Sequence, residues 1–168
     1  MNEPAIRRAE IADVPALLEI YNHYIVNTHI TFDLEPHTLD QRLAWFATFG
    51  DAGRYQCFVA EHGGRAIGWA SSAPFKERAA YQTSVETSIY LAPGEIGRGI
   101  GFRLYQALFD ALERVDVHRA YGGISLPNET SIGLHKRMRF VLVGTYREVG
   151  YKFGRFWDVA IYERPVKQ

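Results

Sequence analysis

Hydrophobic and polar residues alternate without a break between Thr83 and Leu91. One face of this run carries Val85, Thr87, Ile89 and Leu91, and the other carries Ser84, Glu86, Ser88 and Tyr90. A period of two residues is typical of a β-strand with one buried face. Two shorter strand-like runs, Gln56–Glu61 and Ala66–Ser72, flank Gly63 and Gly64, which predicts a β-hairpin.

Helical spacing replaces this alternation near the start of the chain. Asp13 is placed as an N-cap, with Pro15 in the first turn. The apolar face that follows consists of Leu17, Leu18, Tyr21, Tyr24 and Ile25. Thr38 and Gln41 form a capping-box pattern that opens a second helix, from Leu39 to about Phe49.

The second half of the chain mixes helices and strands. A helix that begins close to Phe102 has an apolar face formed by Leu104, Leu108, Ala111, Leu112 and Val115. Glu129–Met138 is a short helix, and the other strands are Ala5–Ala9, Arg119–Leu126, Phe140–Val149 and Phe156–Glu163. The predicted order, β-α-α-β-β-β-α-β-α-β-β, indicates a mixed α/β or α+β fold with helices covering a sheet. No linker or repeat interrupts it, so we expect a single domain over residues 1–168.

Composition narrows the class of protein. The chain has 47% hydrophobic residues, enough for a core, and a formal net charge of zero, which argues against a general nucleic-acid binder. Cys57 is the single cysteine, and the six histidines show no metal-binding spacing, so we expect neither a disulfide framework nor a metal site. The sequence contains no apolar stretch long enough for a membrane span. We therefore expect a cytoplasmic protein without a membrane partner.

A glycine-rich loop, Gly97-Arg98-Gly99-Ile100-Gly101, separates the clearest strand from an amphipathic helix. The first amides of a helix lack internal acceptors and attract phosphate groups. The loop lacks the Lys and Ser/Thr of a P-loop, and Phe102 stands where a dinucleotide-binding loop needs its third glycine. A flexible helix cap without a ligand is the alternative interpretation of these glycines.

The segment from Ile96 to Gly101 resembles the fingerprint of the GNAT acetyltransferase superfamily, Arg/Gln-x-x-Gly-x-Gly/Ala, except that Ile96 occupies the first position. The resemblance implies that backbone amides of this loop bind the pyrophosphate of coenzyme A. The residues to which it assigns this contact are Gly97, Arg98, Gly99, Ile100, Gly101 and Phe102.

A second family pattern follows at the expected distance. The run Asn128-x-x-Ser131-x-x-x-His135-x-x-x-Arg139-Phe140 resembles the Asn-x-x-Ala/Ser-x-x-x-Tyr-x-x-x-Gly-Phe helix of GNAT enzymes, with His135 in place of Tyr and Arg139 in place of Gly. Leu134-His135 is similar to the phosphinothricin acetyltransferase branch. Further matches to that branch are Asn22-His23-Tyr24-Ile25, Phe32 with Glu35-Pro36, Lys76-x-Arg78-x-x-Tyr81, Glu86-x-Ser88-x-Tyr90, Leu126-Pro127-Asn128 and Gly150-x-Lys152-x-Gly154-x-x-x-Asp158-Val159.

The chain thus resembles the phosphinothricin or methionine-sulfoximine N-acetyltransferases, which implies a GNAT fold with a central mixed sheet flanked by helices. It implies transfer of acetyl from acetyl-CoA to the α-amino group of a small amino acid, such as phosphinothricin or methionine sulfoximine or sulfone. An α-ammonium group is mostly charged at neutral pH, so a base is needed, and the resemblance assigns that role to Glu86. His135 would donate a proton to the leaving thiolate or assist deprotonation. A solvated strand carboxylate and a packed histidine are the alternative interpretations of these two residues.

The resemblance also implies cofactor contacts outside the glycine loop. The backbone of Ile89, Tyr90 and Leu91 would pair with the pantetheine arm, and one of these amides would hold the oxyanion. The Asn128 side chain would bind the cofactor, and Ser131 is a further candidate.

An anionic amino acid needs cations for its recognition, and Lys76, Arg78 and Tyr81 form a local cluster. Arginine can donate two parallel hydrogen bonds to a carboxylate or phosphinate. An exposed charged loop is the alternative interpretation. Phe32 and Val159 match positions that form the apolar walls of the family's substrate pocket.

Two other functions stay open at this point. The same cofactor could serve another acceptor, such as a peptide or a polyamine. The chain could also be a non-catalytic acyl-CoA-binding or partner-binding module, for which the departures at Ile96 and Arg139 are the best support. The resemblance implies a homodimer with a small-molecule substrate.

Overall fold

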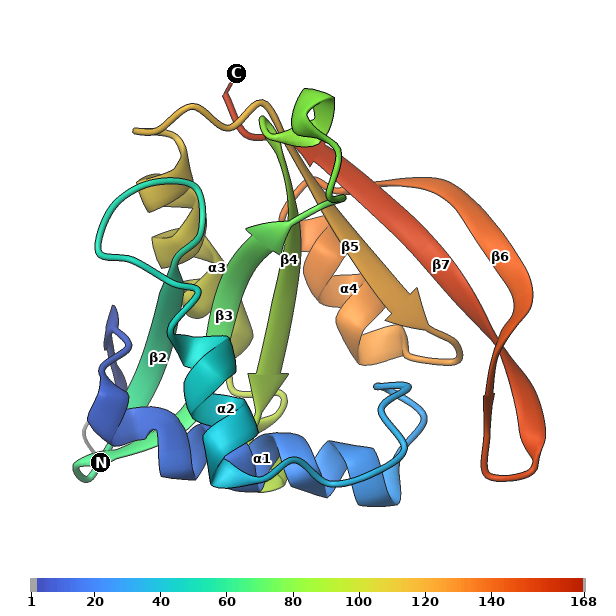
Figure 1. The fold of residues 1–168 in the computed structure, drawn as a ribbon, viewed down its shortest axis with the longest axis horizontal. Helices are drawn as coiled ribbons and strands as arrows, with labels where there is room; N and C mark the ends of the chain where they lie inside the picture. The colour runs from blue at the N-terminus through green and yellow to red at the C-terminus, as the bar shows by residue number, and fades with distance from the viewer. Residues whose placement is uncertain (1–2, 168) are drawn as a thin grey trace.

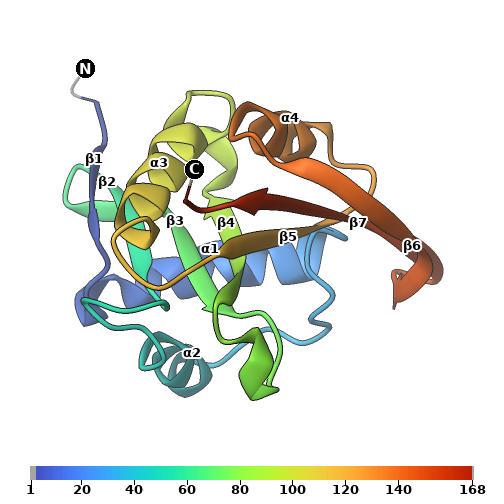
Figure 2. The same ribbon diagram turned by 90° about the horizontal axis from the view of Figure 1, so that it is seen from above.

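The computed structural model describes residues 3–167, which form one seven-stranded sheet with helices on both faces (Figures 1 and 2). The strand order is β1-β2-β3-β4-β5-β7-β6. The strands are β1 (Ala5–Arg8), β2 (Cys57–His62), β3 (Arg65–Pro74), β4 (Ser84–Leu91), β5 (Arg119–Ser125), β6 (Val141–Lys152) and β7 (Arg155–Pro165). The helices are α1 (Val14–Asn27), α2 (Leu39–Phe46), α3 (Ile100–Leu112) and α4 (Glu129–Arg137). The predicted element order and the mixed α/β class are confirmed.

The sheet is antiparallel except between its two central strands. β4 and β5 run parallel, and they pair only where Ser84–Glu86 of β4 lies opposite Arg119–Tyr121 of β5. Beyond Glu86 the two strands diverge, as their separating arrows show in Figure 1. The second half of β4 therefore keeps β3 as a partner on one edge and leaves its other edge open.

Two hydrophobic clusters hold the layers together. On one face, α3 packs with Leu104, Leu108 and Leu112, which are fully buried, as the helical spacing predicts. On the other face, Leu17 of α1 packs with Trp69 of β3 in a second cluster. Figure 2 shows α3 and α4 on one side of the sheet and α1 and α2 on the opposite side. Both faces of the sheet are thus covered where β4 opens.

Of the two predicted helix caps, one forms the expected hydrogen bonds and the other does not. Thr38 and Gln41 form the expected capping box at the start of α2, which ends at Phe46. Asp13 occupies the N-cap of α1, but its side chain accepts no hydrogen bond from that helix. Its carboxylate instead binds Arg7 and accepts from the Glu10 N–H, which closes a short 3₁₀ turn. Burial opposes ionisation of Asp13, but these bonds outweigh it and hold the pKa of Asp13 below its ordinary value.

α2 is attached to the sheet by a buried cation. The Arg42 guanidinium stands 3.4 Å from the ring centroid of Trp45 and 4.7 Å from those of Tyr21 and Trp69. Burial lowers the pKa of Arg42 to about 10, while the rings offer partial compensation through cation–π attraction. This contact fixes α2 against α1 and β3, and with it the far end of the loop that joins the two helices.

The last two strands form a hairpin that is longer than the sequence predicts. β6 extends to Lys152 rather than to Val149, and its register against β7 shifts twice. Such bulges sharpen the local twist of a strand pair. In Figure 1 the tip of this hairpin reaches well beyond the rest of the sheet.

Gly68 of β3 lies opposite Leu91 of β4. A Cβ atom at Gly68 would lie 2.4 Å from Leu91 Cδ2 and 2.8 Å from the Tyr90 carbonyl oxygen. We predict that Gly68→Ala lowers the free energy of unfolding by about 1–3 kcal/mol, as overpacking does. Gly133→Ala on the exposed side of α4 meets nothing within 4 Å and serves as the matched control. Urea denaturation measures both, and equal stabilities of the two variants would contradict the prediction.

Candidate active site

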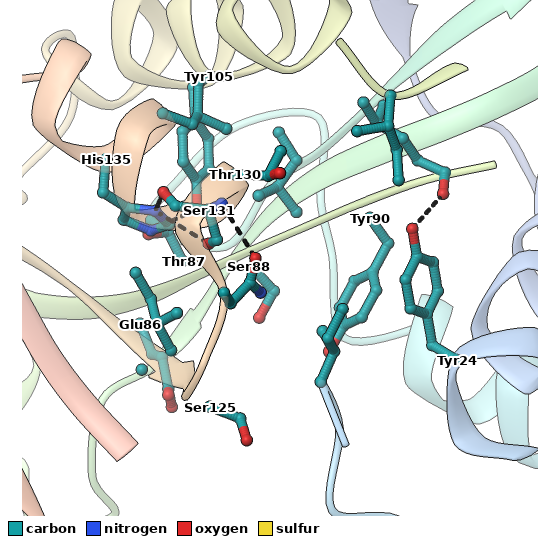
Figure 3. Close-up of a pocket in the computed structure, with 18 residues that line it drawn as sticks. Tyr24, Glu86, Thr87, Ser88, Tyr90, Tyr105, Ser125, Thr130, Ser131 and His135 are labelled. Atoms are coloured by element: carbon teal, nitrogen blue, oxygen red, sulfur yellow. Dashed lines mark hydrogen bonds between the residues drawn. The ribbon is translucent and has the colours of Figure 1, made fainter. Parts of the chain in front are cut away.

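The divergence of β4 and β5 forms a cleft of about 220 Å³ that is open to solvent. Figure 3 shows its walls, which come from both strands and from α3 and α4. Seven of the predicted site residues line it: Glu86, Ile89, Tyr90, Leu91, Asn128, Ser131 and His135. Both predicted catalytic residues and five of the predicted cofactor-binding residues thus come together in the cleft, whereas the predicted contacts of the glycine loop, Gly97–Phe102, are not part of its lining.

The alternation of β4 gives the cleft two chemically different sides. Thr87 and Ile89 face α3 and α4: a Cβ atom at Gly101 would lie 3.5 Å from Ile89 Cδ1 and 3.2 Å from Leu134 Cδ2. Glu86 faces the opposite side of the sheet, where a Cβ atom at Gly123 would lie 3.8 Å from Glu86 Oε1. One ligand can thus approach from the side of α3 and α4, and a second from the side of Glu86.

Glu86 is exposed to solvent in the cleft, and its carboxylate lies beside Gly123 of β5. Partial desolvation raises the pKa of Glu86 above its ordinary value. Glu86 pairs in register with Tyr121 of β5. Val159 of β7 lies beside Gly123 on the same side of the sheet as Glu86. Glu86 is a carboxylate whose environment makes it a better proton acceptor than a freely solvated one.

Both ring nitrogens of His135 form hydrogen bonds, and the ring is buried in the core beside the cleft. Its Nδ1 lies 2.8 Å from the carbonyl oxygen of Ser131, so this nitrogen carries a proton and donates it. Its Nε2 lies 3.3 Å from the Tyr105 hydroxyl, which then donates to it. Burial lowers the pKa of His135, in keeping with a neutral imidazole. Figure 3 shows both contacts as dashed lines.

The open edge of β4 presents backbone amides to the cleft. The Ala92 N–H donates to Ile67 of β3, and the alternation of an antiparallel ladder then directs the N–H groups of Ile89 and Leu91 away from β3. By the same alternation the backbone of Tyr90 faces β3, so of the three predicted backbone contacts only the other two point into the cleft. The Leu91 carbonyl on this edge accepts a hydrogen bond of 2.7 Å from the Tyr24 hydroxyl of α1.

The glycine loop leads directly into α3. Gly97 and Gly99 have φ values of +83° and +77°, a left-handed conformation that favours glycine. The helix begins at Ile100, close to Phe102 as predicted, and Gly99 is its N-cap. Ile96, the residue that departs from the family fingerprint, lines the cleft with an apolar side chain.

Asn128 is the N-cap of α4, at the wall of the cleft. Its side-chain oxygen accepts from the Ser131 N–H at 3.1 Å. The Ser131 hydroxyl lies 3.3 Å from His135 Nδ1. These contacts order the start of α4 along the wall of the cleft that faces α3.

The predicted acceptor-binding residues do not line this cleft directly. Lys76 Nζ lies over the rings of Phe75 and Tyr81, at 5.2 and 5.4 Å from their centroids. Phe75 in turn stacks on Tyr121, the residue that pairs with Glu86. The cluster with Arg78 therefore lies beyond Glu86, on the same side of the sheet. Phe32 packs on Gly150 of β6, and Val159 reaches Gly123.

Sequence reasoning missed several wall residues. They are Tyr24, Ile30, Thr87, Ser88, Ile96, Tyr105, Gly123, Ile124, Ser125, Thr130 and Leu134. Some of them carry a signal that could have been used, because Thr87 and Ser88 are immediate neighbours of Glu86 on the predicted strand. Tyr105 carried none, since an aromatic residue on the apolar face of a helix indicates only packing.

Other kinds of site find no support within residues 3–167. The described part of the chain contains no group of three or more His, Cys, Asp and Glu residues that could hold a metal ion. None of its helices is long and apolar enough to cross a membrane.

The diverging strand pair and the glycine-capped helix agree with the acetyltransferase fold that the sequence resemblance implies, and similarity to known proteins confirms this class. Residues 16–140 match the model described as "Acetyltransferase (GNAT) family". The chain belongs to this acetyltransferase family, and it is an enzyme of the N-acetyltransferase class.

The relatives extend over nearly the whole chain. A phosphinothricin N-acetyltransferase from Streptomyces coelicolor is 51% identical over 166 residues, which cover 98% of this chain and 97% of that protein. An L-methionine sulfoximine/L-methionine sulfone acetyltransferase from Pseudomonas aeruginosa is 33% identical, with 95% and 92% covered. A phosphinothricin acetyltransferase from Sinorhizobium meliloti, solved in complex with AcCoA, superposes with a TM-score of 0.93 at 31% identity and covers 99% of this chain and 90% of that one.

The environment of His135 predicts how stability depends on pH. The folded state holds its pKa below the value of about 6.5 expected in the unfolded chain. The unfolded state then binds the proton more tightly, so this contribution to stability is lost as pH falls through about 6.5. We expect His135→Gln to make the free energy of unfolding less dependent on pH between 7.5 and 5.5.

Urea denaturation at the two pH values measures this dependence, and NMR titration of the imidazole gives its pKa directly. His62→Gln, at the exposed end of β2, is the matched control. A measured pKa for His135 at or above 6.5 would refute the neutral assignment.

Proposed function

We propose that the protein transfers acetyl from acetyl-CoA directly to the α-amino group of a small amino acid of the phosphinothricin or methionine-sulfoximine type. The observation that carries this proposal is the open edge of β4, with Glu86 on one side and the α3–α4 wall on the other. Two ligands can meet there without passing through a covalent enzyme intermediate. The names of the relatives from Streptomyces coelicolor and Pseudomonas aeruginosa support this class of acceptor.

On the α3–α4 side, the residues present fit acetyl-CoA. The amides of the Gly97–Phe102 segment would bind the pyrophosphate at the positive end of the α3 dipole. The N–H groups of Ile89 and Leu91 would bind the pantetheine arm and the oxyanion of the tetrahedral intermediate. Asn128 and Ser131 would border the arm at the start of α4. The Sinorhizobium meliloti structure with AcCoA supports this assignment.

On the other side, Glu86 would remove a proton from the acceptor ammonium group, either directly or through a water molecule. Its raised pKa favours this role, because a carboxylate with a higher pKa is a stronger base. Lys76 and Arg78, with Tyr81, would attract the acidic groups of the acceptor from beyond Glu86. Phe32 and Val159 would provide apolar walls.

His135 is less suited to donating a proton to the leaving thiolate than its titration range suggests. The neutral ring donates its one proton to Ser131, and Nε2 is engaged by Tyr105. We assign it instead to positioning Tyr105 and the start of α4, both of which border the cofactor side of the cleft.

An amine panel with acetyl-CoA tests the acceptor. We expect thiol release with phosphinothricin or methionine sulfoximine at a kcat/KM well above that with a polyamine or a peptide amine. Faster turnover of a polyamine or a peptide would instead favour the second acceptor class. Cofactor binding without turnover of any amine would favour the non-catalytic acyl-CoA-binding module and refute the proposal.

Glu86→Gln tests the base in the same assay. We expect kcat to fall about 10²–10⁴-fold, because a positioned base contributes that much, while the KM for acetyl-CoA stays within about twofold. In the wild type, kcat/KM should fall as pH drops through the raised pKa of Glu86, and the variant should lose this dependence. Glu113→Gln, exposed just beyond α3, is the control. Unchanged turnover in Glu86→Gln would remove Glu86 as the base.

We also propose that two copies associate through β6. This strand lies at the edge of the sheet, and its large apolar side chains are more than half exposed. They include Val141, Leu142, Val143, Tyr146, Val149 and Tyr151. An uncovered apolar edge strand of this length is a liability in a monomer, and a second copy would cover it.

Val143→Lys is expected to convert a dimer to a monomer, because it places a charge within the proposed interface. Light scattering after gel filtration measures the mass of each species. Ile11→Lys, which replaces an exposed apolar side chain on the 3₁₀ turn before α1, should leave the mass unchanged. A monomeric wild type, or a dimer that survives Val143→Lys, would overturn the proposed interface.

We propose a cytoplasmic location and no nucleic-acid or membrane partner, in keeping with the zero net charge and the single, buried Cys57. Acetylation replaces a cationic ammonium group with a neutral amide, so the enzyme would confer resistance to a toxic amino acid that must keep its charge to act. Growth of a sensitive host that expresses the chain tests this role.

A further inference from the structure

The tip of the β6–β7 hairpin holds the loop between α1 and α2. Three residues of the hairpin, Gly150, Lys152 and Trp157, each contact a residue of the segment from His29 to Phe32. In Figure 1 this loop passes between the end of α1 and the hairpin, below the ends of β5 and α4. The loop contains no helix or strand between Asn27 and Leu39, and α1 also holds it, because the Tyr21 hydroxyl donates to Asp33 at 2.6 Å.

Lys152 makes the most unusual of these contacts. Its residue is only 4% exposed, and its ammonium group donates to the carbonyl oxygen of Thr31 at 2.8 Å. Burial lowers the pKa of Lys152, and the charge of Asp33 partly offsets this effect. A buried ammonium group is costly unless its hydrogen bonds are well made. The side chain therefore ties the loop backbone to β6 at one defined point.

Phe32 follows Thr31 directly, and its ring packs against β6 at Gly150. A Cβ atom at Gly150 would lie 2.3 Å from two carbon atoms of the Phe32 ring. The ring thus occupies space that only glycine leaves, and Lys152 lies two residues further along the same strand. The same short segment of β6 therefore fixes both the Thr31 carbonyl and the Phe32 ring.

The preceding part of the loop reaches the cleft. The His29 ring stacks on Trp157 with centroids 4.1 Å apart, and its Nε2 donates to the Pro127 carbonyl at 3.0 Å. Ile30 lines the cleft itself. The segment between His29 and Phe32 is therefore fixed at both ends, with its middle forming part of the cleft wall.

We propose that Lys152 is a positioning residue for the acceptor amino acid: by holding the Thr31 carbonyl, it fixes Ile30 and Phe32 as walls of the acceptor site. This rests on the proposed function, in which Phe32 borders the acceptor. Lys152 contacts Thr31, Phe153 and Trp157, none of which is among the residues proposed to bind acetyl-CoA. Loss of the contact should therefore weaken acceptor binding selectively.

Lys152→Met tests this proposal, because it keeps the length of the side chain and removes its charge and its donors. We expect the acceptor KM to rise about tenfold, with kcat and the KM for acetyl-CoA within about twofold. Hydrogen exchange of the 28–34 peptide should accelerate, while peptides of α3 and β2 stay unchanged. Lys167→Met, an exposed lysine near the end of the chain, is the matched control.

A double-mutant cycle with Phe32→Ala separates positioning from a general structural effect. If Lys152 acts through Phe32, adding Lys152→Met to Phe32→Ala raises the acceptor KM much less than tenfold. Full multiplication of the two effects, equal changes in both KM values, or unchanged exchange in the 28–34 peptide would each overturn the proposal. Should the wild type turn over no amino acid, the proposed function fails, and the exchange experiment still decides whether Lys152 orders the loop.

Discussion

The backbone hydrogen bonds that β4 and β5 stop making after Glu86 are the constraint on which the rest of the site depends. Buried backbone groups need partners, so a strand can leave its neighbour only where something else satisfies it. Here β3 continues along one edge of β4, while the other edge opens onto solvent in the cleft. The opening lies between two helical layers that keep the diverging strands in place.

The alternation of β4 turns this opening into a meeting place for two reactants. Neighbouring side chains point to opposite faces, so Glu86 and Thr87 serve different compartments although they are adjacent in sequence. The proposed chemistry uses this directly: the base and the acyl donor approach the same backbone from opposite sides.

Much of this could be predicted from the sequence, because the signals are local. The alternation around Glu86, the Gly63–Gly64 hairpin and the Thr38–Gln41 box each depend on a few neighbouring residues. Properties that depend on distant residues could not be predicted. The role of the Asp13 carboxylate depends on Arg7, and the tautomer of His135 depends on Tyr105 and on a backbone carbonyl. The point at which β4 and β5 part has no signal in either strand.

The hydrogen bond from Tyr24 to the Leu91 carbonyl has a consequence for how the protein avoids aggregation. An open strand edge offers both donors and acceptors, and so invites another strand to extend the sheet. Tyr24 occupies the last acceptor on this edge and leaves the neighbouring donors available. An extended arm with amide groups can still bind the N–H groups and the Ile89 carbonyl on this edge, but a strand that extended the sheet would find the Leu91 acceptor occupied.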